Sequence, residues 1–150
     1  MNYLAVIETT PTGYSGFIPD LDARVMVAMP TLESLRKHLA EGLALYLRDH
    51  PDAPPATSVQ LSDLPDLEGM SDLTAEMIAP AAFNPVSLEL ASAVRAAHLR
   101  PADLARKLNV TRASVSRLLD PFYFGQSLES LRKIADALGA ELTVQLKLPH

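Results

Sequence analysis

One segment, DLARKLNVTRASVSRLL from Asp103 to Leu119, constrains the fold of this chain more than any other. Apolar residues recur at helical spacing in two short blocks, and Asn109 and Thr111 lie between them. Asparagine tolerates positive φ better than most other non-glycine residues, and threonine is a common N-cap. The segment therefore predicts two short helices that are joined by a tight turn, with an apolar interior formed by Leu104, Ala105, Leu108, Val110, Val115 and Leu118.

Further helical patterns surround this pair. SLELASAVRAAHL predicts a helix with Ser87 as its N-cap, and Pro101 is acceptable in the first turn of the next one. SLESLRKIADAL predicts a last helix that ends at Gly139. After it, apolar and polar residues alternate strictly from Glu141 to Leu148, which predicts a strand. A single strand is not stable, so we expect a partner, and a second copy of the chain is the simplest one.

The N-terminal half has the alternation of β-strands. Three strands are predicted at Asn2–Glu8, Tyr14–Pro19 and Arg24–Met29, followed by a helix from the N-cap Thr31 to about Asp49. A proline-rich loop precedes a weaker fourth strand at Ala75–Phe83, where Pro80 indicates a sheet edge or a strand end. The predicted fold class is α+β, with a β-β-β-α-β module over residues 1–84 and a small helical module with a C-terminal strand over residues 85–150.

Charge also divides the chain. Residues 1–84 contain four basic and twelve acidic residues, a balance of −8, whereas residues 85–150 contain nine basic and six acidic residues, a balance of +3. Opposite signs in two modules suggest different partners. The chain has no cysteine, which excludes disulfides and thiolate sites, and no apolar run approaches the roughly 18 residues of a membrane span. The N-terminus lacks a basic signal-peptide region, so we expect a cytoplasmic protein with no membrane partner.

The outer side of the second predicted short helix carries residues that suit DNA. Arginine can bind guanine O6 and N7 together, and serine can bond base edges or phosphates. From Arg95 to Asp120 there are six basic and two acidic residues, a local balance of +4 that would attract phosphate. The same residues could simply be the solvated face of a helical bundle. The candidate contacts on this side are Arg112, Ala113, Ser114, Ser116 and Arg117.

The block from about Leu88 to Leu138 resembles the Cro/repressor class of helix-turn-helix domains. The resemblance implies that Arg112, Ala113, Ser114 and Arg117 face base edges, and that Arg100 and Ala102 lie near phosphate. Pro101 stands where that class often has a DNA-contacting glutamine, so this contact is lost. The N-terminus of the helix keeps its favourable dipole for a phosphate group.

A second resemblance covers nearly the whole chain. YLAVIE, GYSGFIPDL and PTLESLRKHLAEGLALYL are similar to the N-terminal domain of HicB antitoxins, although PDLDAR replaces the common PDLPGC. LARKLNVTRASVSRLLDP and SLESLRKIADALGAEL are similar to the helix-turn-helix tail of some members. The resemblance implies a degraded RNase H-like first domain that neutralises HicA, a small, basic, mRNA-cleaving toxin. It also implies a second domain that represses the operon by binding operator DNA, as a homodimer or higher homo-oligomer.

The acidity of the first module suits a basic, RNA-binding partner, because complementary fields speed association. Many small soluble domains are acidic without such a partner. A ligand-sensing transcription regulator therefore stays an alternative.

An RNase H-like fold also raises the possibility of a metal-dependent nuclease. Such a site needs carboxylates that converge on two cations, and the candidates are Glu8, Asp20 and Asp22. Aspartate in a turn usually accepts backbone hydrogen bonds, and the spacing of the histidines forms no metal site, so we expect no enzyme, cofactor or metal. The aromatic loop Phe122–Phe124 is expected to cover the core, and a partner or dimer contact is the alternative.

Overall fold

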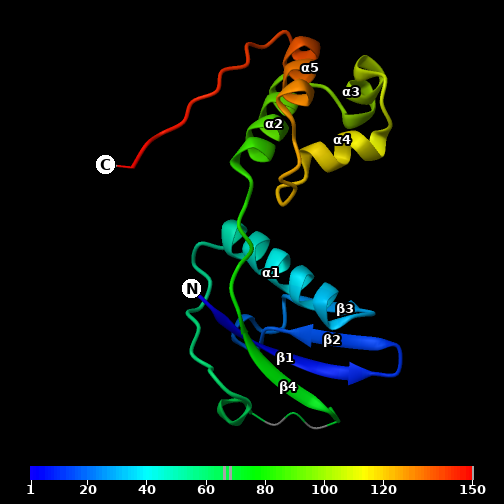
Figure 1. The fold of residues 1–150 in the computed structure, drawn as a ribbon. Coiled ribbons are helices and arrows are strands. Elements are labelled where there is room, and N and C mark those ends of the chain that lie inside the picture. The colour runs from blue at the N-terminus through cyan, green and yellow to red at the C-terminus, as the bar shows by residue number, and fades with distance from the viewer. Residues whose placement is uncertain (66, 68, 150) are drawn as a thin grey trace. The chain divides into compact units, whose positions relative to one another are not determined.

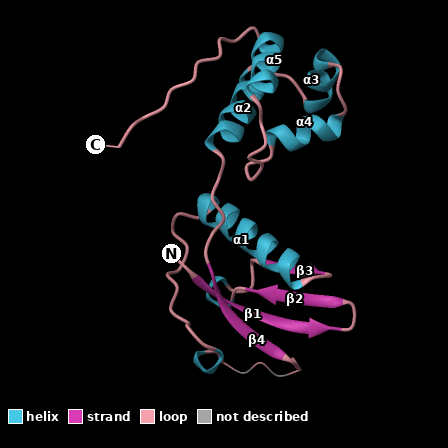
Figure 2. Cartoon of the chain, in the orientation of Figure 1, coloured by secondary structure: helices cyan, strands magenta, loops and turns pink. Residues whose placement is uncertain are grey.

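The computed structural model describes residues 1–65, 67 and 69–149. These residues form four β-strands, five α-helices and two short 3-10 helices, so the chain is a mixed α+β protein (Figures 1 and 2). Contacts divide it into two compact units, Met1–Ala82 and the part from Phe83 onward. The sheet lies in the first unit, and four of the five α-helices lie in the second.

The sheet of the first unit is antiparallel throughout. Its strands are β1 (Tyr3–Thr10), β2 (Gly13–Phe17), β3 (Met26–Met29) and β4 (Leu73–Ile78), in the spatial order β3-β2-β1-β4. The element order β-β-β-α-β agrees with the prediction. β2 is shorter than predicted because the chain turns after it into the 3-10 helix η1 (Pro19–Leu21). β4 begins two residues before the predicted Ala75 and ends at Ile78 rather than at Phe83. It is an edge strand that ends before Pro80, as the proline indicated.

Helix α1 (Leu32–Asp49) covers one face of this sheet (Figure 1). It begins where the Thr31 hydroxyl accepts a hydrogen bond from the backbone N–H of Ser34, at 3.2 Å, so the predicted N-cap is confirmed. Leucines four residues apart form one apolar stripe along the helix. The stripe packs on alternate residues of β1, and the resulting buried core includes Leu35, Leu39, Leu43, Tyr3, Ala5 and Ile7.

Gly16 is the point where α1 comes very close to the sheet. It is buried in β2 and pairs with Ile7, whose side chain lies in the core beneath α1. A Cβ atom at Gly16 would lie 2.9 Å from Cδ1 of Leu39, which is closer than side chains normally approach. The absence of a side chain therefore lets the helix lie on the strand.

The second unit consists of α2 (Pro85–Ala96), α3 (Pro101–Leu108), α4 (Arg112–Leu119) and α5 (Leu128–Leu138). Its core is small, with Val94, Leu104, Ala105 and Val115 buried together. Pro101 occupies the first turn of α3, and Gly139 ends α5 with a left-handed φ of 66°, both as predicted. The helices are thus short elements that share one apolar centre.

The N-cap of α2 is Asn84, and the prediction of Ser87 is wrong. The Asn84 side-chain oxygen accepts from the backbone N–H of Val86 at 3.0 Å, and α2 begins at Pro85. Ser87 lies inside the helix and is fully buried. Its hydroxyl donates to the Tyr123 carbonyl at 3.2 Å and accepts from the amide of Gln126 at 2.6 Å. Ser87 is therefore part of a polar contact with the loop after α4.

Asn84 takes part in the same contact. Its side-chain amide donates to the Tyr123 carbonyl at 2.7 Å and to the Gln126 side-chain oxygen at 2.9 Å. Its backbone N–H donates to the carbonyl of Pro121. We call Asn84, Ser87, Tyr123 and Gln126 the polar cluster. Since Asn84 and Ser87 are buried, these bonds satisfy groups that water cannot reach.

The predicted C-terminal strand is not formed within the single chain. Residues 141–149 have no regular secondary structure, and within the described part of the chain they make no backbone hydrogen bond (Figure 2). The apolar residues of the alternating pattern are open to solvent, with exposed fractions of 39% for Leu142, 66% for Val144, 88% for Leu146 and 84% for Leu148. The pattern is that of a strand, but its partner is not supplied by this chain.

Candidate nucleic-acid interface

The turn between α3 and α4 has the conformation that the sequence predicts. Asn109 is left-handed, with φ 54° and ψ 47°, and its backbone N–H caps the end of α3. Thr111 then caps α4, because its hydroxyl oxygen accepts from the backbone N–H of Ser114 at 3.1 Å. The two helices are thus joined by only three residues, Asn109–Thr111.

Most of the predicted interior of this pair is buried, but one residue is not. Leu104 and Val115 are fully buried and Ala105 nearly so, which fixes the inner faces of α3 and α4. Leu108 and Leu118 are half-buried. Val110 is 45% exposed, so its assignment to the interior is wrong. It follows Asn109 directly, and the left-handed turn places it at the surface rather than between the helices.

The outer face of α4 carries a stripe of exposed residues, namely Arg112, Ala113, Ser116 and Arg117. Arg112 and Ser116 are four residues apart, as are Ala113 and Arg117, so all four lie on one side of the helix. The opposite side contains the buried Val115. We call these four residues the α4 stripe.

Ser114 differs from the other predicted contacts on this helix. It is half-buried, and its hydroxyl lies 2.9 Å from that of Thr111, with which it shares a hydrogen bond. Its backbone N–H is also engaged by the Thr111 side chain. The structure therefore places Ser114 in the cap of α4, at the edge of the α4 stripe.

The two arginines of the α4 stripe have guanidinium groups free for a ligand. Among the residues that the structure describes, neither Arg112 nor Arg117 forms an ion pair or a side-chain hydrogen bond. A free guanidinium presents five N–H donors in a planar fork, which matches two acceptors on one base edge or two phosphate oxygens. The α4 stripe thus has the donors that recognition of nucleic acid requires.

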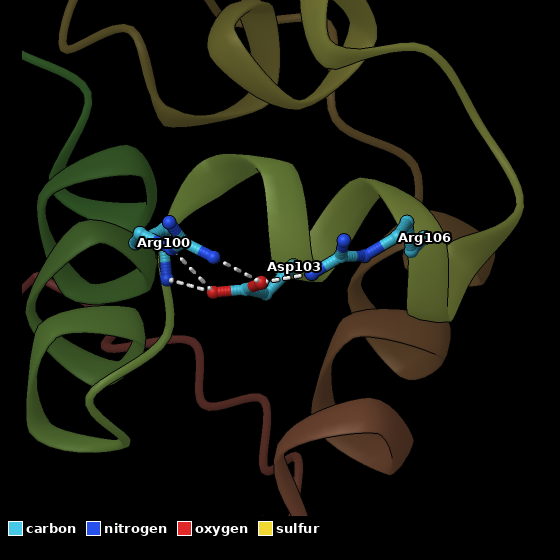
Figure 3. Close-up of polar contacts among 3 residues, drawn as sticks. All are labelled: Arg100, Asp103 and Arg106. Carbon is cyan, nitrogen blue, oxygen red and sulfur yellow. Dashed lines mark hydrogen bonds and ion pairs between the residues drawn. The ribbon is translucent and has the colours of Figure 1, made fainter.

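Arg100, by contrast, is already paired (Figure 3). Its guanidinium donates to both carboxylate oxygens of Asp103, with Nε to Oδ2 at 3.0 Å and Nη2 to Oδ1 at 3.2 Å. The backbone N–H of Arg100 also donates to Asp103, at 3.0 Å, which closes a cap on the first turn of α3. Arg106 pairs with the same carboxylate from the other side. Asp103 therefore holds Arg100, a predicted phosphate contact, and Arg106, which contributes to the local positive charge.

This pairing strongly favours the charged form of Asp103. The side-chain hydrogen bonds from Arg100, together with its backbone N–H, lower the pKa of Asp103 to about 2. The resemblance to the Cro/repressor class implies that Arg100 lies near phosphate, but it does not predict this pair. The signal was present, because opposite charges three residues apart on a helix are neighbours.

Ala102, the last predicted contact, is half-buried at the first turn of α3. It lines a shallow hollow beside the turn, together with Asn109 and Arg112 among others. Ala102 carries no polar side chain, so any contact with phosphate there depends on the backbone of the helix start.

We expect Asp103→Asn to steepen the salt dependence of DNA binding. The change removes one negative charge and releases Arg100 and Arg106, so each new phosphate contact should add about 0.9 to the slope of log affinity against log salt. Binding titrations over a series of salt concentrations measure that slope. Glu89→Gln is the matched control, because Glu89 is an exposed charge of α2 that forms no ion pair with the residues described by the structure. Equal slopes for the two variants would show that Asp103 does not restrain the arginines.

The candidate nuclease residues do not converge. Asp20 accepts hydrogen bonds from the backbone N–H groups of Thr57 and Ser58, at 2.8 and 2.9 Å, and from both of their hydroxyls. Burial raises the pKa of Asp20, but these hydrogen bonds outweigh it, and the net pKa is lowered. Asp22 is exposed with a left-handed φ of 53°, and Glu8 is half-buried on β1. No group of three or more metal-ligating side chains gathers among the described residues.

The aromatic loop Phe122–Phe124 is partly buried and partly exposed. Phe122 stacks on Phe83 with 5.2 Å between the ring centroids, and both Phe122 and Tyr123 are half-buried. That these two rings cover the core stays a prediction. Phe124 is exposed. In the described part of the chain, no helix is both long enough and apolar enough to cross a membrane.

Comparisons with known proteins give likenesses to solved structures. No protein-family model matches the chain, and no curated protein matches it. A solved structure described as the crystal structure of antitoxin HicB3 is similar to it, with 20% sequence identity and a TM-score of 0.39. The match covers 74% of this chain and 99% of that one.

Proposed function

We propose that this protein is the antitoxin of a type II toxin–antitoxin system. Its first unit binds and neutralises a HicA-like mRNA-cleaving toxin, and its second unit represses its own operon as a Cro/repressor-type helix-turn-helix domain. The sequence resemblance to both parts of HicB antitoxins supports this proposal. The proposal includes an RNase H-like arrangement of the first unit and a cytoplasmic location.

The single observation that carries DNA binding is the α4 stripe. Arg112 and Arg117 have free guanidinium groups and lie on one side of a helix whose other side is fixed by Val115. α4 then lies in the major groove, with Arg112, Ala113, Ser116 and Arg117 at base edges and Ser114 beside them. Arg100, Ala102 and the start of α3 lie near the phosphates. A homodimer presents two such helices to the two halves of a palindromic operator.

The charge of the first unit supports a basic partner. The −8 balance lies wholly within it, and several of its acidic side chains are exposed, namely Asp22, Glu33, Asp49, Asp52, Asp63 and Asp72. Such a field accelerates encounter with a positively charged protein and weakens as salt screens it. A small basic toxin that binds RNA fits this surface electrostatically.

The test is to tag this chain in its native cell, purify it and identify what accompanies it. We expect a small basic protein in stoichiometric amount, whose cleavage of mRNA in vitro stops when this chain is added. A variant with both Arg112→Ala and Arg117→Ala should retain that protein, since these residues belong to the other unit. A chain that purifies alone and yet binds its own promoter would favour a ligand-sensing regulator instead.

A nuclease is the weaker alternative on structural grounds. Both carboxylate oxygens of Asp20 accept hydrogen bonds from Thr57 and Ser58, so this carboxylate holds a loop in place. A metal ion there would have to displace those donors. Mg²⁺-dependent cleavage of RNA by the purified chain, abolished by Glu8→Gln, would revive the nuclease alternative.

A further inference from the structure

We propose that residues 140–148 of two copies of this chain pair as antiparallel β-strands in one register, with the two Val144 residues opposite each other. We call this segment the C-terminal segment. The proposal specifies how two copies are joined. It does not depend on whether the dimer binds DNA or a toxin.

The first argument is the exposure of the C-terminal segment. Its four large apolar side chains alternate with polar ones, and three of them are more than half exposed. In the described chain, residues 141–149 also leave their backbone N–H and C=O groups without a backbone partner. A strand with free backbone groups and one apolar face is a template for pairing with another strand. The sequence therefore fits a strand whose partner comes from a second molecule.

The second argument is that the C-terminal segment is complementary to itself in only one register. Residues directly opposite in an antiparallel pair lie on the same face, so the registers that join the two apolar faces are centred on a residue. Centring on Val144 places Leu142 opposite Leu146 and, on the other face, Glu141 opposite Lys147. Because the pairing is two-fold, the Glu–Lys pair occurs twice. Centring on Thr143 or Gln145 places no acidic residue opposite a basic one.

The third argument is that the unit provides a place for the apolar face of this ribbon. A two-stranded ribbon alone is marginally stable, so its apolar face needs a second layer. Leu128 at the start of α5 is 60% exposed and lines a hollow together with Leu142 and Val144. Exposed apolar residues on the helix and on the C-terminal segment are thus already adjacent. We infer that the ribbon closes over Leu128.

Disulfide cross-linking tests the register directly, because the natural chain has no cysteine. In the proposed register the two Val144 Cα atoms are about 4.5–5.5 Å apart, within the range that a disulfide spans. Val144→Cys should therefore form a covalent dimer under mild oxidation of the full-length protein. Leu148→Cys is the matched control, because its two sulfurs would lie eight residues apart along the ribbon, about 26 Å. Equal cross-linking of both variants, or of neither, would overturn the proposal.

Charge reversal gives a second, independent test. Glu141→Lys and Lys147→Glu should each raise the dimer dissociation constant about tenfold, because two attractive pairs become repulsive in each case. The double variant should restore the original constant, and mixing the two single variants should yield heterodimers, detected by native mass spectrometry. Failure of rescue would reject this register. DNA binding and toxin binding are not read out in either test, so their loss or retention is a separate result.

Discussion

Replacing Arg117 by alanine should weaken binding to the operator by about 1–3 kcal/mol, a factor of roughly 5 to 150. The guanidinium of Arg117 is free in the described structure and lies on the exposed side of α4. If it binds a guanine through O6 and N7, alanine removes both hydrogen bonds and leaves those acceptors without a direct protein donor. Affinity for a random sequence should change far less, since that depends on phosphate contacts. Titration of a labelled fragment from upstream of the gene measures both affinities.

Lys107→Ala is the matched control for this result. Lys107 is exposed near the end of α3 and also carries one positive charge, but it lies outside the α4 stripe. Its loss should weaken binding to operator DNA and to random DNA by the same factor. It should also lower the slope of log affinity against log salt by about 1. If Arg117→Ala behaves in the same way, Arg117 contacts phosphate and does not read a base.

Asn84→Ala should lower the free energy of unfolding of the second unit by about 2–3 kcal/mol. Alanine removes the N-cap of α2, which contributes about 1 kcal/mol. It also leaves the Tyr123 carbonyl and the Gln126 side-chain oxygen short of a donor in a region that is largely buried. Urea unfolding of the full chain, together with hydrogen exchange of the α2 amides, follows this unit separately from the first one.

Two further variants separate the two causes. Asn84→Ser keeps a capping oxygen but loses the amide donors. Its free energy of unfolding should therefore be about 1 kcal/mol higher than that of Asn84→Ala. Ser92→Ala changes an exposed position of α2 and should stay within about 0.5 kcal/mol of the natural chain. If Asn84→Ala, Asn84→Ser and Ser92→Ala all have the same free energy of unfolding as the natural chain, the polar cluster does not contribute to stability.

The sequence predicts those parts of the structure that depend on neighbouring residues. Thr31, Thr111 and Gly139 cap helices at the expected positions, and Asn109 adopts the left-handed conformation expected of a turn. Each of these is decided within a few residues of chain, by the geometry of a helix end. The position of Arg112 and Arg117 on one exposed face follows equally from helical spacing.

The errors arise where distant residues decide the outcome. Ser87 has the chemistry of an N-cap, but its partners, Tyr123 and Gln126, lie almost 40 residues away and hold it inside the unit. The signal for Asn84 as the N-cap is local, because an asparagine directly before a proline commonly starts a helix. The alternation after Glu141 predicts a strand that the single chain does not form, because no local rule can supply a second strand.

The error at the candidate site has a local cause, because Arg100 and its partner Asp103 are three residues apart. Arg100 carries the charge expected near phosphate, but the bond to Asp103 engages it in the free protein. The charge balance of +4 from Arg95 to Asp120 does not tell which of the basic side chains are free to bind DNA. Asp20 shows the converse case, since its predicted hydrogen bonds exist but come from Thr57 and Ser58, far along the chain, rather than from its own turn.

The close approach of α1 to β2 has a consequence for sequence variation. Strand interiors generally favour β-branched or aromatic residues, and glycine weakens them. Position 16 reverses this preference, because Leu39 occupies the space where a side chain would begin. Among sequences that keep the same helix and sheet, position 16 should accept few alternatives to glycine. An alanine there should appear together with a smaller residue at position 39.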